Sequence, residues 1–70
     1  MLDTGIPLTA AELRLLPYLS THLSIQQISD RLFVSRNTVK SQTVSVYRKL
    51  GVSTRSDAVT RAQEIGLLPA

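Results

Sequence analysis

The sequence predicts an all-α domain of four helices, in which the second and third form a helix-turn-helix. Four hydroxyl residues each stand just before a segment whose apolar side chains recur at helical spacing, as helix N-caps do. The chain has only 70 residues and no cysteine, so we expect one small core without disulfides or a cysteine-based metal site. Because so short a chain buries little apolar surface, no catalytic cleft and no cofactor are expected.

The first helix is expected over about residues 10–19. Thr9 and Glu12 have the spacing of a capping box, in which each side chain accepts a hydrogen bond from the backbone N–H of the other residue. Pro17 has no N–H to donate, which predicts either a kink or an early end of this helix.

The second helix is expected over about residues 25–32, after a second capping box formed by Ser24 and Gln27. Ser35 then caps the next periodic segment, so only a very short connection separates the two helices. Two short helices joined by a tight turn are the helix-turn-helix arrangement.

The third helix is expected over about residues 36–50, and Gly51 follows it as the usual residue of a left-handed C-terminal cap. At about 100° per residue, one group of side chains gathers on the side expected to face the core. These are Val39, Thr43, Val46 and Leu50.

The fourth helix is expected over about residues 55–65, capped by Ser53 or Thr54 and ended by Gly66. Small and apolar residues form a stripe along it: Ala58, Val59, Ala62 and Ile65. Packing onto the first and third helices is the ordinary role of such a stripe.

Charge is unevenly distributed along the chain. Residues 31–61 hold seven basic side chains and one acidic side chain, a net charge of +6, whereas residues 1–30 have a net charge of −2. A solvated charged face is the simplest interpretation, but such a distribution also attracts a polyanion to the C-terminal half.

The exposed face of the third helix favours nucleic acid over simple solvation. Most solvated helix surfaces pair charges of opposite sign, but residues 36–50 contain no acidic residue. On the face of this helix that is expected to be exposed, basic side chains occur together with short hydrogen-bonding side chains and one apolar residue, Val44. Such a face fits a major groove, where a valine can meet a thymine methyl group.

The sequence resembles the C-terminal DNA-binding domain of LuxR-type transcription regulators, also called the GerE or NarL/FixJ-type helix-turn-helix. The residues that carry the resemblance are the run 35–40 (SRNTVK), the run 49–52 (KLGV), Arg55 and Ala58. Further matches extend upstream to Leu8, so the resemblance spans about residues 8–68. The resemblance implies a third helix in the major groove and a fourth helix that pairs with its copy in a homodimer on double-stranded DNA.

Matching positions assign roles to individual residues. The resemblance implies base-edge contacts from Asn37, Lys40, Ser41 and Val44. It implies phosphate contacts from Ser35, Thr38 and Lys49, and the charge argument adds Arg48. The implied dimer interface consists of Ala58, Val59 and Ala62.

Three positions depart from the family pattern. Ala11 stands where an arginine is usual, so the ion pair of that arginine is absent. His22 stands where glycine is common, which predicts a left-handed cap after the first helix. Gln42 replaces a frequent histidine beside the base-reading residues.

The resemblance also implies the domain organisation. Residues 1–7 are expected to be a flexible arm, and residues 8–70 the DNA-binding domain of a longer regulator, at its C-terminal end. No apolar run is long enough for a membrane span and no charged signal start is present, which predicts a cytoplasmic protein without membrane contact.

Alternative functions remain at this point. Region 4 of a sigma factor has a similar helix-turn-helix and would contact RNA polymerase, although the ending 49–52 favours the LuxR type. A helical adaptor for a protein partner would bind without DNA. An enzyme is not expected, because the acidic residues are scattered, His22 has no evident partner and no glycine-rich phosphate loop occurs.

Overall fold

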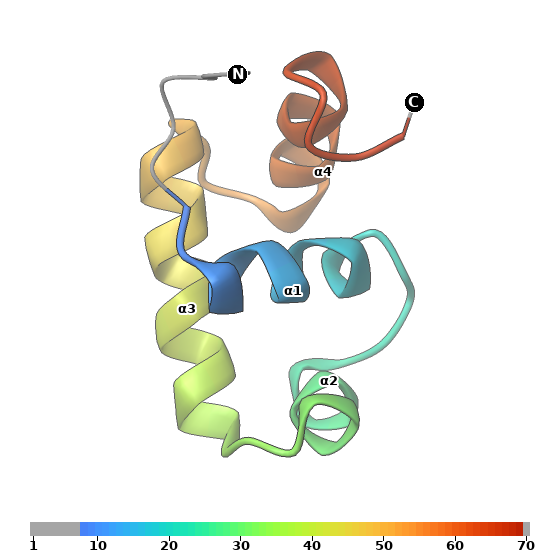
Figure 1. Ribbon diagram of the computed structural model, residues 1–70, viewed down its shortest axis with the longest axis vertical. Coiled ribbons are helices and arrows are strands. Elements are labelled where there is room, and N and C mark those ends of the chain that lie inside the picture. Colours follow the sequence, from blue (N-terminus) through green and yellow to red (C-terminus); the bar gives the residue numbers. More distant parts are fainter. Residues whose placement is uncertain (1–7, 70) are drawn as a thin grey trace.

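A computed structural model describes residues 8–69 and has the predicted all-α fold (Figure 1). Its helices are α1 (Ala10–Leu19), α2 (Ile25–Leu32), α3 (Arg36–Leu50) and α4 (Arg55–Glu64). The first three have the expected bounds, and α4 ends one residue early because Ile65 takes the C-terminal cap. No strand occurs within residues 8–69. The predicted arm, residues 1–7, lies outside the described residues.

Local side-chain caps set the helix starts. In the first capping box, the Thr9 N–H donates to Glu12 Oε1 at 2.8 Å and the Glu12 N–H donates to Thr9 Oγ1 at 3.1 Å. Ser24 and Gln27 form the second box in the same way. At the start of α4 the cap is Thr54, which accepts a hydrogen bond from the Asp57 N–H at 3.0 Å. Each cap satisfies amides that the helix itself leaves without partners.

Pro17 does not end α1 early. The helix continues through Leu19, and the Pro17 ring lies on the exposed side of the helix. The proline removes the donor to the carbonyl of Leu13, one turn earlier and on the same exposed side, where water can take the place of the missing N–H.

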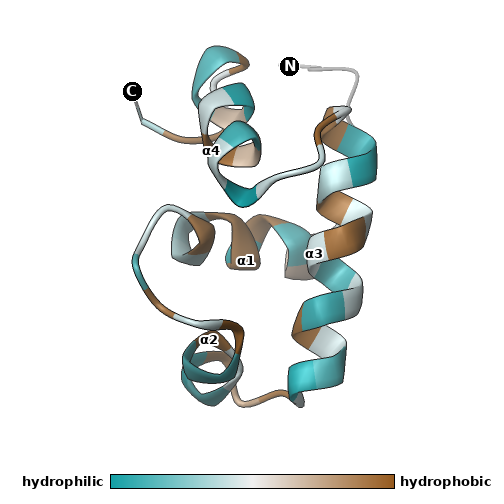
Figure 2. Cartoon of the chain, turned by 180° about the vertical axis from the view of Figure 1, so that it is seen from behind, coloured by the Kyte–Doolittle hydropathy of each residue, from teal (hydrophilic) through white to brown (hydrophobic). Residues whose placement is uncertain are grey.

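The helices pack around one small core. In Figure 1, α3 runs along one side of the molecule, and α2, α1 and α4 lie against it in that order from one end to the other. The central helix α1 is largely apolar, whereas apolar and polar segments alternate along α3 (Figure 2). The expected core face of α3 is confirmed, because all four of its residues are buried: Val39, Thr43, Val46 and Leu50.

Backbone with a positive φ occurs at the ends of α2 and α3 and, at Gly66 with φ 85°, just after α4; the one at the end of α2 is unexpected. Gly51 ends α3 with φ 72°, as predicted. Phe33 ends α2 with φ 58°, and it is the one non-glycine residue of the described range with a positive φ. The expectation of a left-handed cap at His22 was therefore wrong. The chain leaves α1 through Ser20, which has φ −83° in the right-handed region, so no strained residue is needed there.

Candidate nucleic-acid interface

The predicted base-reading residues form one continuous exposed strip on α3. Asn37, Lys40, Ser41 and Val44 are all exposed. They follow the i, i+3, i+4, i+7 spacing that places side chains on one helix face. Val44 is 62% exposed, so this valine takes no part in the core. The structure therefore brings together all four residues, with their side chains available to a partner.

Unpaired positive charge surrounds this strip. The ion pairs within residues 8–69 are Lys49–Glu12 and Arg61–Glu64, so Arg36, Lys40 and Arg48 have no acidic partner there. Arg36 and Arg48 are exposed near the two ends of α3. Because no carboxylate offsets these charges, the face presents a positive field to the solvent.

The side chains of Ser35 and Thr38 interact with each other at the N-terminal end of α3. Ser35 Oγ accepts a hydrogen bond from the Thr38 N–H at 3.1 Å and lies 2.9 Å from Thr38 Oγ1. Ser35 is exposed and Thr38 half-buried. Both hydroxyls thus lie at a helix N-terminus, where free amides and the helix dipole favour an anion. Their contact with DNA phosphates stays a prediction.

Lys49 has a partner that the sequence did not indicate. Its ammonium Nζ donates to Glu12 Oε1 at 2.8 Å, which joins the C-terminal part of α3 to the start of α1. Ser45 Oγ donates to the other oxygen of Glu12 at 2.7 Å, and the Thr9 N–H donates to Oε1. Lys49 therefore helps to place α3, in addition to any phosphate contact it makes.

The carboxyl group of Glu12 is strongly acidic in this setting. Glu12 is only 4% exposed, and burial on its own raises the pKa of a carboxyl group. Hydrogen bonds from Lys49, Ser45 and the Thr9 backbone outweigh that effect and hold the pKa of Glu12 at about 2. The ionised form is thus the one that the fold stabilises.

Arg55 connects α4 to the end of α1. Its guanidinium donates to the carbonyl oxygens of Leu19 at 2.9 Å, Tyr18 at 3.0 Å and Thr21 at 2.9 Å. Because α1 has no basic residue in its last turn, Arg55 supplies the cation that favours a helix C-terminus. The sequence included Arg55 only as part of the family pattern and gave no sign of these bonds, which span more than 30 residues.

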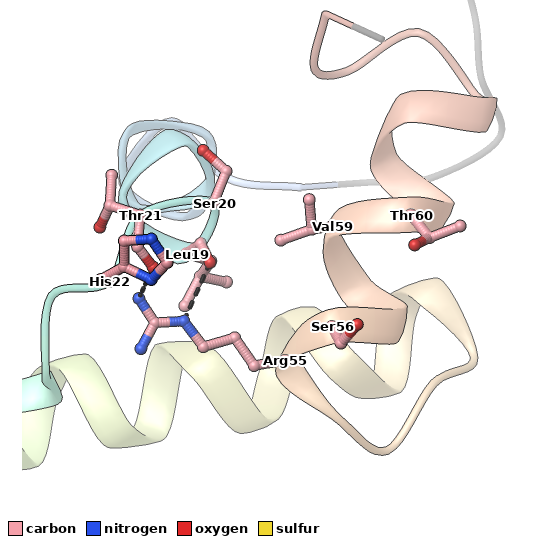
Figure 3. A pocket seen from close by; sticks show the side chains of 8 residues that line it. All are labelled: Leu19, Ser20, Thr21, His22, Arg55, Ser56, Val59 and Thr60. Atoms are coloured by element: carbon pink, nitrogen blue, oxygen red, sulfur yellow. Dashed lines mark hydrogen bonds between the residues drawn. The ribbon is translucent and has the colours of Figure 1, made fainter.

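An open hollow lies beside Arg55, between the end of α1 and the start of α4 (Figure 3). Its lining residues are Leu19, Ser20, Thr21, His22, Arg55, Ser56, Val59 and Thr60. The hollow lies away from the strip on α3, and none of the predicted DNA-contacting residues lines it.

The residues predicted for a dimer lie in two different environments. Ala58 and Ala62 are fully buried within one chain and belong to its core. In this conformation they have no surface to offer a second copy. Val59 is half-buried and lines the hollow, so it retains area that a partner can cover. The role of α4 in a dimer stays a prediction.

Two further features are absent from residues 8–69. No helix there is both long enough and apolar enough to cross a membrane. No group of three histidine, cysteine, aspartate or glutamate side chains gathers there in a way that could hold a metal ion.

Comparison with known families identifies the domain. Residues 6–62 match the family model GerE, described as bacterial regulatory proteins of the luxR family. The chain belongs to the luxR family. The resemblance inferred from the sequence is thereby confirmed, and membership implies DNA-binding regulation of transcription.

Two relatives of this LuxR-family domain are much longer proteins. The transcriptional regulatory protein YdfI of Bacillus subtilis (strain 168) is 41% identical over 61 residues, which cover 87% of this chain and 29% of that protein. A crystal structure of the response regulator ChrA, from a heme-sensing two-component system, matches with a TM-score of 0.83 and 41% identity. That match covers 87% of this chain and 30% of ChrA. The chain thus spans less than a third of either relative.

Proposed function

We propose that this LuxR-family domain binds double-stranded DNA sequence-specifically, with α3 in the major groove, and that it regulates transcription as a dimer joined through α4. The observation that carries the proposal is the strip Asn37, Lys40, Ser41 and Val44, whose four residues are all exposed and have no acidic neighbour on their helix. At 1.5 Å per residue, the 15 residues of α3 form a rod about 22 Å long, and a major groove about 12 Å wide admits it.

Each residue of the strip has a matching base-edge partner. The ammonium of Lys40 can donate to guanine O6 and N7, and the amide of Asn37 can pair with adenine N6 and N7. Ser41 is short enough to allow close approach and to bond to either type of base, while Val44 suits a thymine methyl group. Arg36, Arg48, Ser35, Thr38 and Lys49 are proposed to contact phosphates, which set position and not sequence.

The dimer is proposed to use the exposed side of α4 beside Val59, since Ala58 and Ala62 serve the core of each copy. Two recognition helices on one face of the duplex would then read half-sites whose centres lie about 34 Å apart, one helical turn. An inverted or direct repeat is the operator expected from this arrangement.

The proposal is tested by titrating the chain into labelled duplex DNA at two salt concentrations, with random sequence first and a selected operator second. We expect binding that weakens steeply with salt, because each phosphate contact releases a counterion. Lys40→Ala should weaken operator binding by about 1 to 3 kcal/mol and relax one base preference.

Arg61→Ala is the matched control, because it also removes one cation, but from α4 and from a side chain already paired with Glu64 at 3.6 Å. It should leave the base preference unchanged. If the wild-type chain fails to bind DNA at low salt, α3 is not a groove reader, and an adaptor that binds a protein partner becomes the better explanation.

A further inference from the structure

Phe33 is an aromatic side chain that the fold does not use. It is 94% exposed, so its ring packs against nothing within the described residues. Its backbone is left-handed, with φ 58° and ψ 40°, a conformation that glycine or asparagine adopts at much lower cost. Glycine would allow the same turn without strain and without an exposed ring. Folding therefore accounts for neither the strain nor the exposure, which suggests a partner outside the chain.

Exposed cations precede and follow Phe33 in the sequence. Arg31 precedes Phe33 in the last turn of α2, and Arg36 begins α3; both are exposed, and neither has an ion-pair partner within residues 8–69. The nearest acidic residue in sequence, Asp30, accepts a hydrogen bond from Gln26 Nε2 at 3.1 Å. An exposed apolar ring with an exposed arginine two residues before it and another three residues after it suits a partner that alternates apolar and anionic groups along its length.

The turn lies at one extremity of the molecule, far from α4 (Figure 1). It leads directly into Ser35 and Asn37, the start of the proposed DNA-reading face. In helix-turn-helix proteins the N-terminal end of the recognition helix contacts the bases, and the preceding helix crosses the DNA backbone. With α3 docked as proposed, the turn that holds Phe33 lies beside the DNA backbone that forms the wall of the major groove.

We propose that the Phe33 ring packs on the deoxyribose of the DNA backbone at the wall of the groove, while Arg31 and Arg36 bind the phosphates on either side. This inference rests on the proposed function. The sugar–phosphate backbone alternates apolar C–H surface with anionic groups, which is the pattern that the turn complements. The contact is independent of base sequence, so it adds affinity without changing specificity.

The test compares Phe33→Gly and Phe33→Asn with the wild-type chain on a random duplex and on a selected operator. Both replacements suit a left-handed backbone, so both variants should fold, and the stability of Phe33→Gly should equal or exceed that of wild type. We expect each variant to lose affinity about three- to tenfold on both duplexes. The salt dependence should not change, because no charge is removed.

Leu13→Ala is the matched control, since Leu13 is 45% exposed on α1 and belongs to no predicted DNA contact. It should leave DNA affinity unchanged. Circular dichroism confirms that every variant is folded before its affinity is compared.

Each other result overturns the inference in a distinguishable way. If wild type binds DNA and Phe33→Gly binds equally well, the proposed function stands but the ring does not contact DNA, and a protein partner is indicated. A loss confined to the operator would mean that the ring reads a base. If wild type itself does not bind, the proposed function and this inference fail together.

Discussion

Replacing Glu12 with glutamine tests whether one buried carboxylate holds α1 and α3 together. The substitution keeps the shape of the side chain but removes its charge. It removes the carboxylate that binds Lys49, whose side chain is 23% exposed. It also places an amide NH2 group opposite Ser45 Oγ, so that the hydroxyl can no longer donate its hydrogen bond there. The Thr9 N–H can still donate to the amide oxygen, so the N-terminal cap of α1 is expected to survive.

The expected magnitude follows from the acidity of Glu12. Its pKa falls from 4.5 to about 2, and each tenfold change in an ionisation equilibrium corresponds to about 1.4 kcal/mol. The ionised carboxylate therefore stabilises the folded state by about 3 kcal/mol relative to the protonated form. For a 70-residue chain this is a large part of the total free energy of unfolding.

The pH dependence has a definite sign. Because the folded pKa is lower than the unfolded one, the contribution is fully present above about pH 4.5 and is lost as the pH falls toward 2. The free energy of unfolding of wild type should thus exceed that of Glu12→Gln by a constant amount from about pH 5 to pH 7. This difference should disappear as the pH falls from about 4.5 to 2.

Urea unfolding followed by circular dichroism measures both effects, because the fold is all-α. Glu64→Gln is the matched control: its carboxylate also lies in an ion pair, 3.6 Å from Arg61, but the side chain is 60% exposed. An exposed pair of this kind should contribute less than about 0.5 kcal/mol. If Glu12→Gln cost no more than Glu64→Gln at neutral pH, the inferred role of the buried carboxylate would be refuted.

Three further substitutions probe other contacts. Gly51→Ala should cost about 1 kcal/mol in urea unfolding, because φ is 72° but nothing lies within 4 Å of the added Cβ; no loss would contradict the left-handed cap. Arg55→Met should lower the free energy of unfolding by about 2 kcal/mol, because it removes three hydrogen bonds to the end of α1. The control Arg61→Met should change it little. Lys49→Ala should lower the free energy of unfolding by about 1 to 3 kcal/mol, and the salt slope of DNA binding by about one if Lys49 also contacts a phosphate; an unchanged slope would mean that Lys49 contacts no phosphate.

Local chemistry made most of the fold predictable. The two capping boxes and Ser35 determine where three helices begin, because each side chain bonds to an amide three residues away. The burial of Val39 and Val46 follows from helical spacing, which is likewise a short-range property. The strip of predicted base-reading residues is exposed for the same reason, since a helix that buries one face must expose the opposite one.

Contacts between distant residues were not predictable in this way. Glu12 and Lys49 are 37 residues apart, and nothing in either local pattern indicates that they meet. From the sequence, Glu12 was predicted only to cap the first helix, and Lys49 only to contact a DNA phosphate. The left-handed turn also fell at Phe33 and not at His22, because the tight connection between α2 and α3 requires a reversal that the longer connection after α1 does not.

The position of α1 has a consequence for how the domain opens. Its first turn is tied to α3 through Glu12 and Lys49, and its last carbonyls are tied to α4 through Arg55. Neither α3 nor α4 can detach without losing the contacts that it makes with one end of α1. Partial unfolding of either helix is therefore disfavoured. Native-state hydrogen exchange should then show the α1 amides exchanging only with the whole molecule, as one cooperative unit. The proposed recognition helix α3 is therefore held as part of one rigid body with α1 and α4.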